Sequence, residues 1–412
     1  MVTNQIIIKK DGNHGVPDNP VIPFIEGDGI GPEISSAAKC VINAGIEAAY
    51  GKKRKILWKE FFAGEKGFNC TGSWLPEETL NAIKKYGIAL KGPLTTPVGE
   101  GMRSINVQLR HSLDLYANVR PVRYIPSAPS PMKNPGSVNM VIFRENTEDL
   151  YAGIEWEAGS KDVLELIAII KEKTGISLPE DSGIGIKPMS ERKTKRLVAR
   201  AISFALNNGF PSVTLMHKGN IMKFTEGAFR KWGYETAREM FAGKTLTEEE
   251  LYGKYKGSCP RGMVVINDRI ADNMFQEVLL KPENYHVIAA PNLNGDYLSD
   301  ALAAQVGGLG IAPGANIGDN YAVFEAVHGT APLLAGKDMA NPLSLILSGV
   351  MMLEFMAWKE SALIIEKAVE NTMKKGRVTS DLAVQIKGAT EVKCSEFAKE
   401  IINNLVSIGR DI

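Results

Sequence analysis

Short apolar runs alternate with longer amphipathic segments along most of this 412-residue chain. The runs carry few charges, which is typical of strands covered on both faces, since a half-exposed strand would alternate apolar and polar residues. We predict strands at residues 21–25, 88–90, 140–143, 213–216, 263–266 and 287–290, and helical stretches at 33–50, 191–207, 226–241 and 344–374. This alternation indicates an α/β fold, and the length predicts two or three domains.

Two apolar segments bear on the location of the protein. Residues 6–8 are isoleucines followed by two lysines, which is the wrong order and length for a secretory signal, and we predict a first strand there. Residues 343–358 are interrupted by Glu354 and fall short of the roughly 20 residues that cross a bilayer, so we predict a buried helix. The four cysteines show no CxxC spacing, which argues against zinc or disulfides. We therefore expect a cytoplasmic protein without membrane association.

The charges nearly balance, with 48 basic and 47 acidic residues, so no overall field favours nucleic acid. Arginines nevertheless cluster between residues 103 and 144, and arginine forks bind carboxylates in a bidentate manner. Surface arginines paired with nearby acids are the alternative. Hydroxyl and amide side chains accompany the cluster, which favours a small ligand with several carboxylates. The cluster and its companions are Arg103, Arg110, Arg120, Arg123, Arg144, Thr95, Thr96, Ser104 and Asn106.

Two pairs of aspartates have i, i+4 spacing, Asp268 with Asp272 and Asp296 with Asp300. On a helix this spacing puts both carboxylates on one face, where they repel unless a cation lies between them. Oxygen-only ligands suit Mg²⁺ or Mn²⁺ better than zinc. Helix-capping aspartates are the alternative, and the occurrence of two such pairs favours a metal site.

Three further motifs carry possible chemistry. Residues 27–32 read G-x-G-x-G-P, which differs from the G-x-G-x-x-G fingerprint and argues against a Rossmann site. Tyr151 and Lys218 are candidate proton carriers, although either could be structural. Glycine-rich stretches precede His328, Gly329, Thr330 and Ala331, and such loops either cradle phosphates through backbone amides or form turns.

Together these stretches resemble the prokaryotic isocitrate dehydrogenases of the β-decarboxylating dehydrogenase family, from about residue 20 to residue 405. The resemblance is carried by GDGIGPE at 27–33, RSINV at 103–107, FRENTED at 143–149, MHKGN at 216–220 and NLNGDYLSD at 292–300. It implies an α/β fold of the isocitrate/isopropylmalate dehydrogenase type, distinct from the Rossmann fold. It also implies a large dinucleotide-binding domain (1–115 and 306–412), a small domain (116–148 and 191–305) and a clasp (149–190) that contacts a second subunit.

The resemblance further implies oxidation and decarboxylation of isocitrate to 2-oxoglutarate and CO₂ in the tricarboxylic acid cycle, in a homodimer with shared active sites. Lys218 of the partner subunit would accept the hydroxyl proton, and Tyr151 would protonate the product enol. Mg²⁺ or Mn²⁺ would act as a Lewis acid. The implied substrate ligands are Ser104, Asn106, Arg110, Arg120 and Arg144. The implied metal ligands are Asp296 and Asp300, with Asp268 from the partner subunit and Asp272 close by. The implied coenzyme contacts are Thr96, His328, Gly329, Thr330, Ala331, Asn341 and Asp381.

Three alternatives remain open. Homoisocitrate and isopropylmalate dehydrogenases share these motifs, but Ser104 and Asn106 suit a third carboxylate better than an alkyl group. A ligand-binding regulatory subunit should have lost part of the catalytic set, which is complete here. For the coenzyme, NADP-dependent members grip the 2′-phosphate with side chains that Leu333, Leu334, Ser380 and Val384 replace. These replacements favour NAD, with NADP as the alternative, and Lys337, Lys374, Lys375 and Arg377 are nearby cations.

Overall fold

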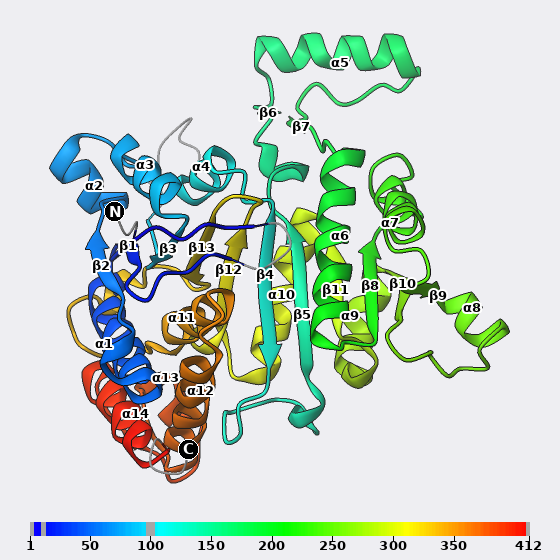
Figure 1. The fold of residues 1–412 in the computed structure, drawn as a ribbon. Coiled ribbons are helices and arrows are strands. Elements are labelled where there is room, and N and C mark those ends of the chain that lie inside the picture. The colour runs from blue at the N-terminus through cyan, green and yellow to red at the C-terminus, as the bar shows by residue number, and fades with distance from the viewer. Residues whose placement is uncertain (1–3, 10–13, 96–103, 409–412) are drawn as a thin grey trace.

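The computed structural model describes residues 4–9, 14–95 and 104–408, and it is built around one mixed sheet of eleven strands (Figure 1). The strands are short and their side chains are mostly buried, because helices cover the sheet on both faces. In order across the sheet they are β2 (Leu57–Glu60), β1 (Val21–Ile25), β3 (Ile88–Lys91), β13 (Ala322–Ala326), β12 (Pro313–Ile317), β4 (Ala117–Arg123), β5 (Asn139–Glu145), β11 (Val287–Ala290), β8 (Ser212–His217), β10 (Val264–Ile270) and β9 (Thr245–Thr247).

The direction of the strands changes at the centre of the sheet. Four strands from β2 to β13 run parallel to one another, and five strands from β5 to β9 form a second parallel set. Between the two sets, β12 is antiparallel to both β13 and β4, and β4 is antiparallel to β5. Such switch points are where open α/β sheets commonly bind ligands.

Each half of the sheet has its own helical layers. The helices of these layers are α1 (Gly31–Tyr50), α2 (Gly64–Thr71), α3 (Glu77–Tyr86), α4 (Ile105–Ser112), α6 (Glu191–Asn208), α7 (Glu226–Met240), α8 (Glu248–Gly253), α9 (Ala271–Leu280), α10 (Asn292–Val306), α11 (Leu343–Phe355), α12 (Lys359–Lys374), α13 (Ser380–Ala383) and α14 (Cys394–Ile408). In the first half, α1, α11, α12 and α14 enclose one core, and α3 and α4 pack on the opposite face. In the second half, α6 and α7 cover one face while α9 and α10 cover the other.

One segment stands apart from these layers. A two-stranded antiparallel sheet of β6 (Glu155–Trp156) and β7 (Ile184–Gly185) leads to α5 (Lys161–Thr174), which projects from the top of the molecule in Figure 1. A second small sheet, β14 (Arg377–Val378) with β15 (Thr390–Glu391), lies near the C-terminal helices.

The predicted α/β class is confirmed, and two local predictions are wrong. Residues 6–8 form no strand, since Ile7 makes only an isolated antiparallel bridge to Gly15. The predicted helix 344–374 is two helices, broken at Ala357, whose φ of 59° lies in the left-handed region. No helix in the described ranges is long and apolar enough to span a membrane.

Candidate active site

A row of polar side chains crosses the sheet where the strand direction changes. Lys91 at the end of β3 is in register with Glu325 of β13, and Asn316 of β12 is in register with Asn118 of β4. Asn118 in turn is in register with Arg144 of β5. All five are at least nine-tenths buried, although most neighbouring strand positions are apolar. Buried polar groups at such a density need partners or a ligand.

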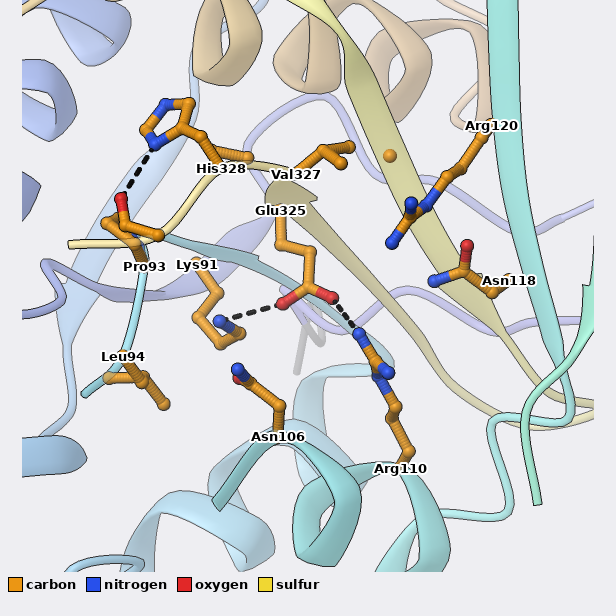
Figure 2. Close-up of a pocket in the computed structure, with 13 residues that line it drawn as sticks. Lys91, Pro93, Leu94, Asn106, Arg110, Asn118, Arg120, Glu325, Val327 and His328 are labelled. Atoms are coloured by element: carbon orange, nitrogen blue, oxygen red, sulfur yellow. Dashed lines mark hydrogen bonds and ion pairs between the residues drawn. The ribbon is translucent and has the colours of Figure 1, made fainter. Parts of the chain in front are cut away.

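The row opens into a cavity of about 140 Å³ between the sheet and α4 (Figure 2). Asn106 and Arg110 of α4, Arg120 of β4 and His328 line it together with Glu325. The cavity therefore joins three of the predicted substrate ligands to a predicted coenzyme contact. The Oδ1 atom of Asn106 and the Nε atoms of Arg110 and Arg120 are buried without a hydrogen-bond partner among the described residues.

Glu325 organises the floor of this cavity. Its carboxylate pairs with Lys91 Nζ at 2.7 Å and with Arg110 Nη2 at 2.9 Å (Figure 2), and it also accepts a hydrogen bond from Asn316. Burial alone would raise the pKa of Glu325, but the charges of Lys91 and Arg110 outweigh it and hold the pKa well below the ordinary range. Two cations thus face the cavity with one carboxylate between them.

Arg120 and Arg144 add two buried guanidinium groups. Arg120 donates to Ser299 at 2.6 Å and to Asp300 at 2.9 Å, while Arg144 donates to Asn292 at 2.8 Å and to Asp296. Burial, together with the positive charges of Arg120 and Arg110, lowers the pKa of Arg144 to about 10. This crowding of like charges is costly on its own, and an anionic ligand would relieve it.

The first turns of α10 bring the predicted metal ligands Asp296 and Asp300 to the edge of the arginine group. Gly295 permits this approach, because a Cβ atom there would lie 2.7 Å from the Cβ of Arg144. Tyr151, in the short helix Asp149–Ala152, donates its hydroxyl to Asp296, and Arg144 lies over its ring. Burial and the hydrogen bond to Asp296 raise the pKa of Tyr151, so this phenol stays protonated at neutral pH.

Lys218 and Asp268 lie away from this group in the same chain. Lys218 follows β8 and pairs with Asp272 of α9, whereas Asp268 of β10 bonds to His217, Arg230 and Tyr234. Burial opposes ionisation of Asp268, but these hydrogen bonds outweigh it and hold its pKa far below the usual range. The prediction that Asp268 and Asp272 share one helix face is wrong, because Asp268 lies within the strand β10 whereas Asp272 lies in the first turn of the helix α9.

The carboxylates of Asp296 and Asp300 could supply only part of the ligand shell of a divalent cation. Asp296 and Asp300 are hard oxygen ligands one turn apart, with side chains that are 28% and 50% exposed. Within the described ranges, no three His, Cys, Asp or Glu side chains gather as a metal site. A complete oxygen shell therefore requires further ligands from outside this group.

The predicted coenzyme loop is held by the glycine motif at residues 27–31. Asp28 accepts backbone hydrogen bonds from Glu65 and Thr95, and Ile30 donates to the Thr330 carbonyl at 2.9 Å. A Cβ atom on Gly29 would lie 2.1 Å from that carbonyl oxygen, so glycine is required there. The motif thus brings two loops together and does not itself form a phosphate site.

Four predicted coenzyme contacts, residues 328–331, lie in a loop whose polar groups and open space suit a bound ligand. His328 has a buried Nε2 atom without a partner among the described residues, Gly329 has open space around its Cα, and Ala331 is left-handed with φ of 39°. Thr330 places its hydroxyl 3.4 Å from that of Thr95. These features fit a dinucleotide that runs along the loop.

The remaining coenzyme predictions lie further along. Asn341 donates to Asp381 at 2.9 Å, so these two residues form one polar pair. Leu333 and Val384 are 84% and 80% exposed. Thr96 lies outside the described residues, as does Arg103. Ser104 is the N-cap residue of α4, where it precedes Asn106 by half a turn.

Some functional residues were missed or misplaced by the sequence analysis. Lys91 and Glu325 line the cavity and were not predicted, although a charge inside the apolar run 322–326 was a visible signal. Arg123 was included in the arginine cluster, but it points elsewhere and pairs with Glu366.

The fold and this site define a class of dinucleotide-dependent dehydrogenase. Residues 21–401 match the family described as isocitrate/isopropylmalate dehydrogenase, and the chain belongs to that family.

Particular relatives extend the match over nearly the whole chain. An isocitrate dehydrogenase [NADP] of Archaeoglobus fulgidus is 55% identical, covering 97% of this chain and 96% of its own length. One of Haloferax volcanii with the same name is 52% identical with the same coverage. The crystal structure of isocitrate dehydrogenase from Methylococcus capsulatus superposes with a TM-score of 0.76 at 36% identity, covering 93% of this chain and 99% of that one. The predicted preference for NAD finds no support in these names.

Proposed function

We propose that this protein is an isocitrate dehydrogenase that oxidises and decarboxylates isocitrate with NADP and a divalent cation. The observation that carries the proposal is a group of three guanidinium groups beside Asp296 and Tyr151: those of Arg120 and Arg144 are buried, and the side chain of Arg110 is 12% exposed. The group suits a ligand with several carboxylates that also reaches a metal. The curated relatives named above carry this activity in their names.

Each group of residues would have a different role in the reaction. The arginines would bind and orient the carboxylates, and their crowded positive charge favours an anionic ligand. A bound Mg²⁺ or Mn²⁺ would supply Lewis acidity at Asp296 and Asp300, and NADP would accept the hydride. Lys218 of the partner subunit would accept the hydroxyl proton. Tyr151, kept protonated by its raised pKa, would protonate the enol carbon after CO₂ departs.

A shared dimeric site is supported by exposed apolar side chains around Lys218. In the single chain, Ile221 and Phe224 are 69% and 91% exposed just after this lysine. The projecting segment carries more, including Ile169 and Ile176 at 45% and 59%. Apolar surface of this kind marks an interface.

The proposed dimer completes the division of the chain. Residues 149–190 would form a clasp on the second subunit, beside a large domain (1–115 and 306–412) and a small domain (116–148 and 191–305). Asp268 and Lys218 would enter the partner's site. A cytoplasmic location stays a prediction.

For the coenzyme, Lys337 is our candidate to contact the 2′-phosphate. Lys375 and Arg377 are already paired, with Asn404 and Glu400 respectively. Lys337 lies exposed in the turn that follows Leu333 and Leu334, so its ammonium group is available to a phosphate.

Purified protein tests the function by substrate choice. We expect kcat/KM for isocitrate to exceed that for isopropylmalate by at least about 100-fold, because an alkyl arm would leave buried polar groups such as Asn106 unpaired. Equal use of the two substrates would contradict the proposal.

A further inference from the structure

Lys187 lies at the centre of a buried charge cluster that the reaction itself does not use. Its side chain is 15% exposed, and its ammonium group pairs with Asp149, whose side chain is 1% exposed. The ammonium group also pairs, at 3.0 Å, with Glu226, whose side chain is fully buried. Lys187 belongs to the segment that returns from β7 to α6. One ammonium group thus lies between two buried carboxylates and pairs with both.

The Asp149 arm of the cluster holds the Tyr151 turn. Asp149 begins this turn, and its backbone N–H donates to the Pro188 carbonyl at 3.0 Å, beside Lys187. Its carboxylate accepts from the backbone N–H of Leu293 at 3.0 Å, which caps the start of α10, the helix that carries Asp296. Asp149 has φ of 71°, a left-handed conformation that persists only when the surroundings enforce it.

The Glu226 arm holds the Lys218 loop. Glu226 begins α7, and its carboxylate accepts a hydrogen bond from the backbone N–H of Lys218. The same carboxylate accepts from Asn294 of α10 at 2.8 Å. The two arms therefore meet twice, on α10 through Leu293 and Asn294, and on the ammonium group of Lys187, which pairs with both carboxylates.

We propose that Lys187 is a positioning residue that sets the Tyr151 turn and the Lys218 loop in one geometry. This inference rests on the proposed function. Because Tyr151 serves its own site whereas Lys218 serves the partner's, Lys187 of one chain supports both active sites of the dimer. Lys187 is not among the residues that line the active-site cavity, and it acts through Asp149 and Glu226.

Two partial reactions separate the arms. Exchange of the C3 hydrogens of 2-oxoglutarate with solvent deuterium, followed by NMR with NADPH and Mg²⁺, reports on Tyr151. Reduction of oxalosuccinate by NADPH, followed by the loss of NADPH absorbance, requires a proton for the new hydroxyl group and reports on Lys218.

The variant Lys187→Met should lose about 100-fold in both partial reactions and in kcat, because both groups are displaced. The KM for isocitrate should stay within about threefold, since the arginines are untouched. Lys187→Arg, which keeps the charge, should recover at least about tenfold of the loss. The matched control is Lys195→Met, which removes another lysine paired with glutamates, in this case between α6 and α7, and which should leave every rate unchanged.

If Lys187→Met does not fold, the positioning role can be tested with Asp149→Asn and Glu226→Gln, because each of these variants leaves one of the two ion pairs of Lys187 intact. Asp149→Asn keeps a residue that tolerates the left-handed backbone and should mainly slow the exchange reaction. Glu226→Gln should mainly slow the reduction. Equal loss of both partial reactions in each variant would mean a merely structural role, and so would a folded Lys187→Met protein with wild-type kcat.

Hybrid dimers with one wild-type chain test the coupling of the sites. A Tyr151→Phe hybrid keeps one intact site and should show about half of wild-type activity. A Lys187→Met hybrid should fall close to the Lys187→Met homodimer, and half activity there would overturn the coupling. If a hybrid of Tyr151→Phe with Lys218→Met is no more active than its parent homodimers, the proposal of a shared active site is wrong. The partial reactions then still test whether Lys187 positions Tyr151 and Lys218.

Discussion

Replacing Glu325 by glutamine should destabilise the protein strongly, although the change removes only one charge. The carboxylate is 8% exposed and lies between Lys91 and Arg110, whose side chains are 2% and 12% exposed. Glutamine keeps the shape and leaves two buried cations without their anion. Breaking a buried ion pair in this way costs about 3–5 kcal/mol in the free energy of unfolding.

The dependence on pH gives the prediction a second test. The folded state lowers the pKa of Glu325 below its unfolded value, so the stabilisation is fully present above the unfolded pKa and is lost as the pH falls. Below about pH 4.5 the advantage of the wild type over Glu325→Gln should therefore shrink by about 1.4 kcal/mol per pH unit.

Urea unfolding measures both effects, and it is done at one fixed protein concentration because the unfolding midpoint of the proposed dimer would depend on concentration. Glu239→Gln is the matched control: Glu239 is 55% exposed, pairs with Lys195 at the surface, and its loss should cost less than about 1 kcal/mol. If Glu325→Gln cost no more than this control, or if its cost did not change with pH, the electrostatic account of the cavity floor would be wrong.

Three further predictions concern activity. Excess EDTA should abolish turnover and added Mg²⁺ or Mn²⁺ should restore it, since Asp296 and Asp300 supply oxygen ligands; full activity in EDTA would contradict a metal site. Arg144→Lys should raise the KM for isocitrate more than about tenfold, because lysine lacks the bidentate fork, and an unchanged KM would remove Arg144 from the substrate ligands. Lys337→Met should lower kcat/KM about tenfold for NADP and leave NAD unaffected; equal effects on both coenzymes would rule out a phosphate contact.

The sequence was most informative where structure depends on local composition. The strands at residues 21–25 and 287–290 were predicted to the residue, because a short apolar run between helices has few other solutions. The break at Ala357 could not be predicted, since neither glycine nor proline marks it and the left-handed backbone there is imposed by packing. The prediction of a strand at residues 6–8 was wrong for a related reason. A strand needs a neighbouring strand to pair with, and the local sequence does not show whether one is present.

The candidate site was likewise predictable where local motifs define it and not where it depends on long-range contacts. The resemblance to a known family predicted Arg120, Arg144 and Tyr151 as site residues, and the structure brings these three side chains together around Asp296. The pairing of Lys91 with Glu325 joins positions more than 200 residues apart, and neither residue carries a sign of the other in its own neighbourhood. Long-range charge pairs of this kind become visible only when the strands are in register.

Product analysis of the wild-type enzyme tests the central claim most directly. Isocitrate, NADP and Mg²⁺ are incubated with the purified protein, and 2-oxoglutarate, CO₂ and NADPH are measured together over time. We predict that the three products appear in equal amounts and that omitting isocitrate or the metal stops all of them. NADPH formed without CO₂, or no reaction with isocitrate under conditions in which isopropylmalate is oxidised, would contradict the account.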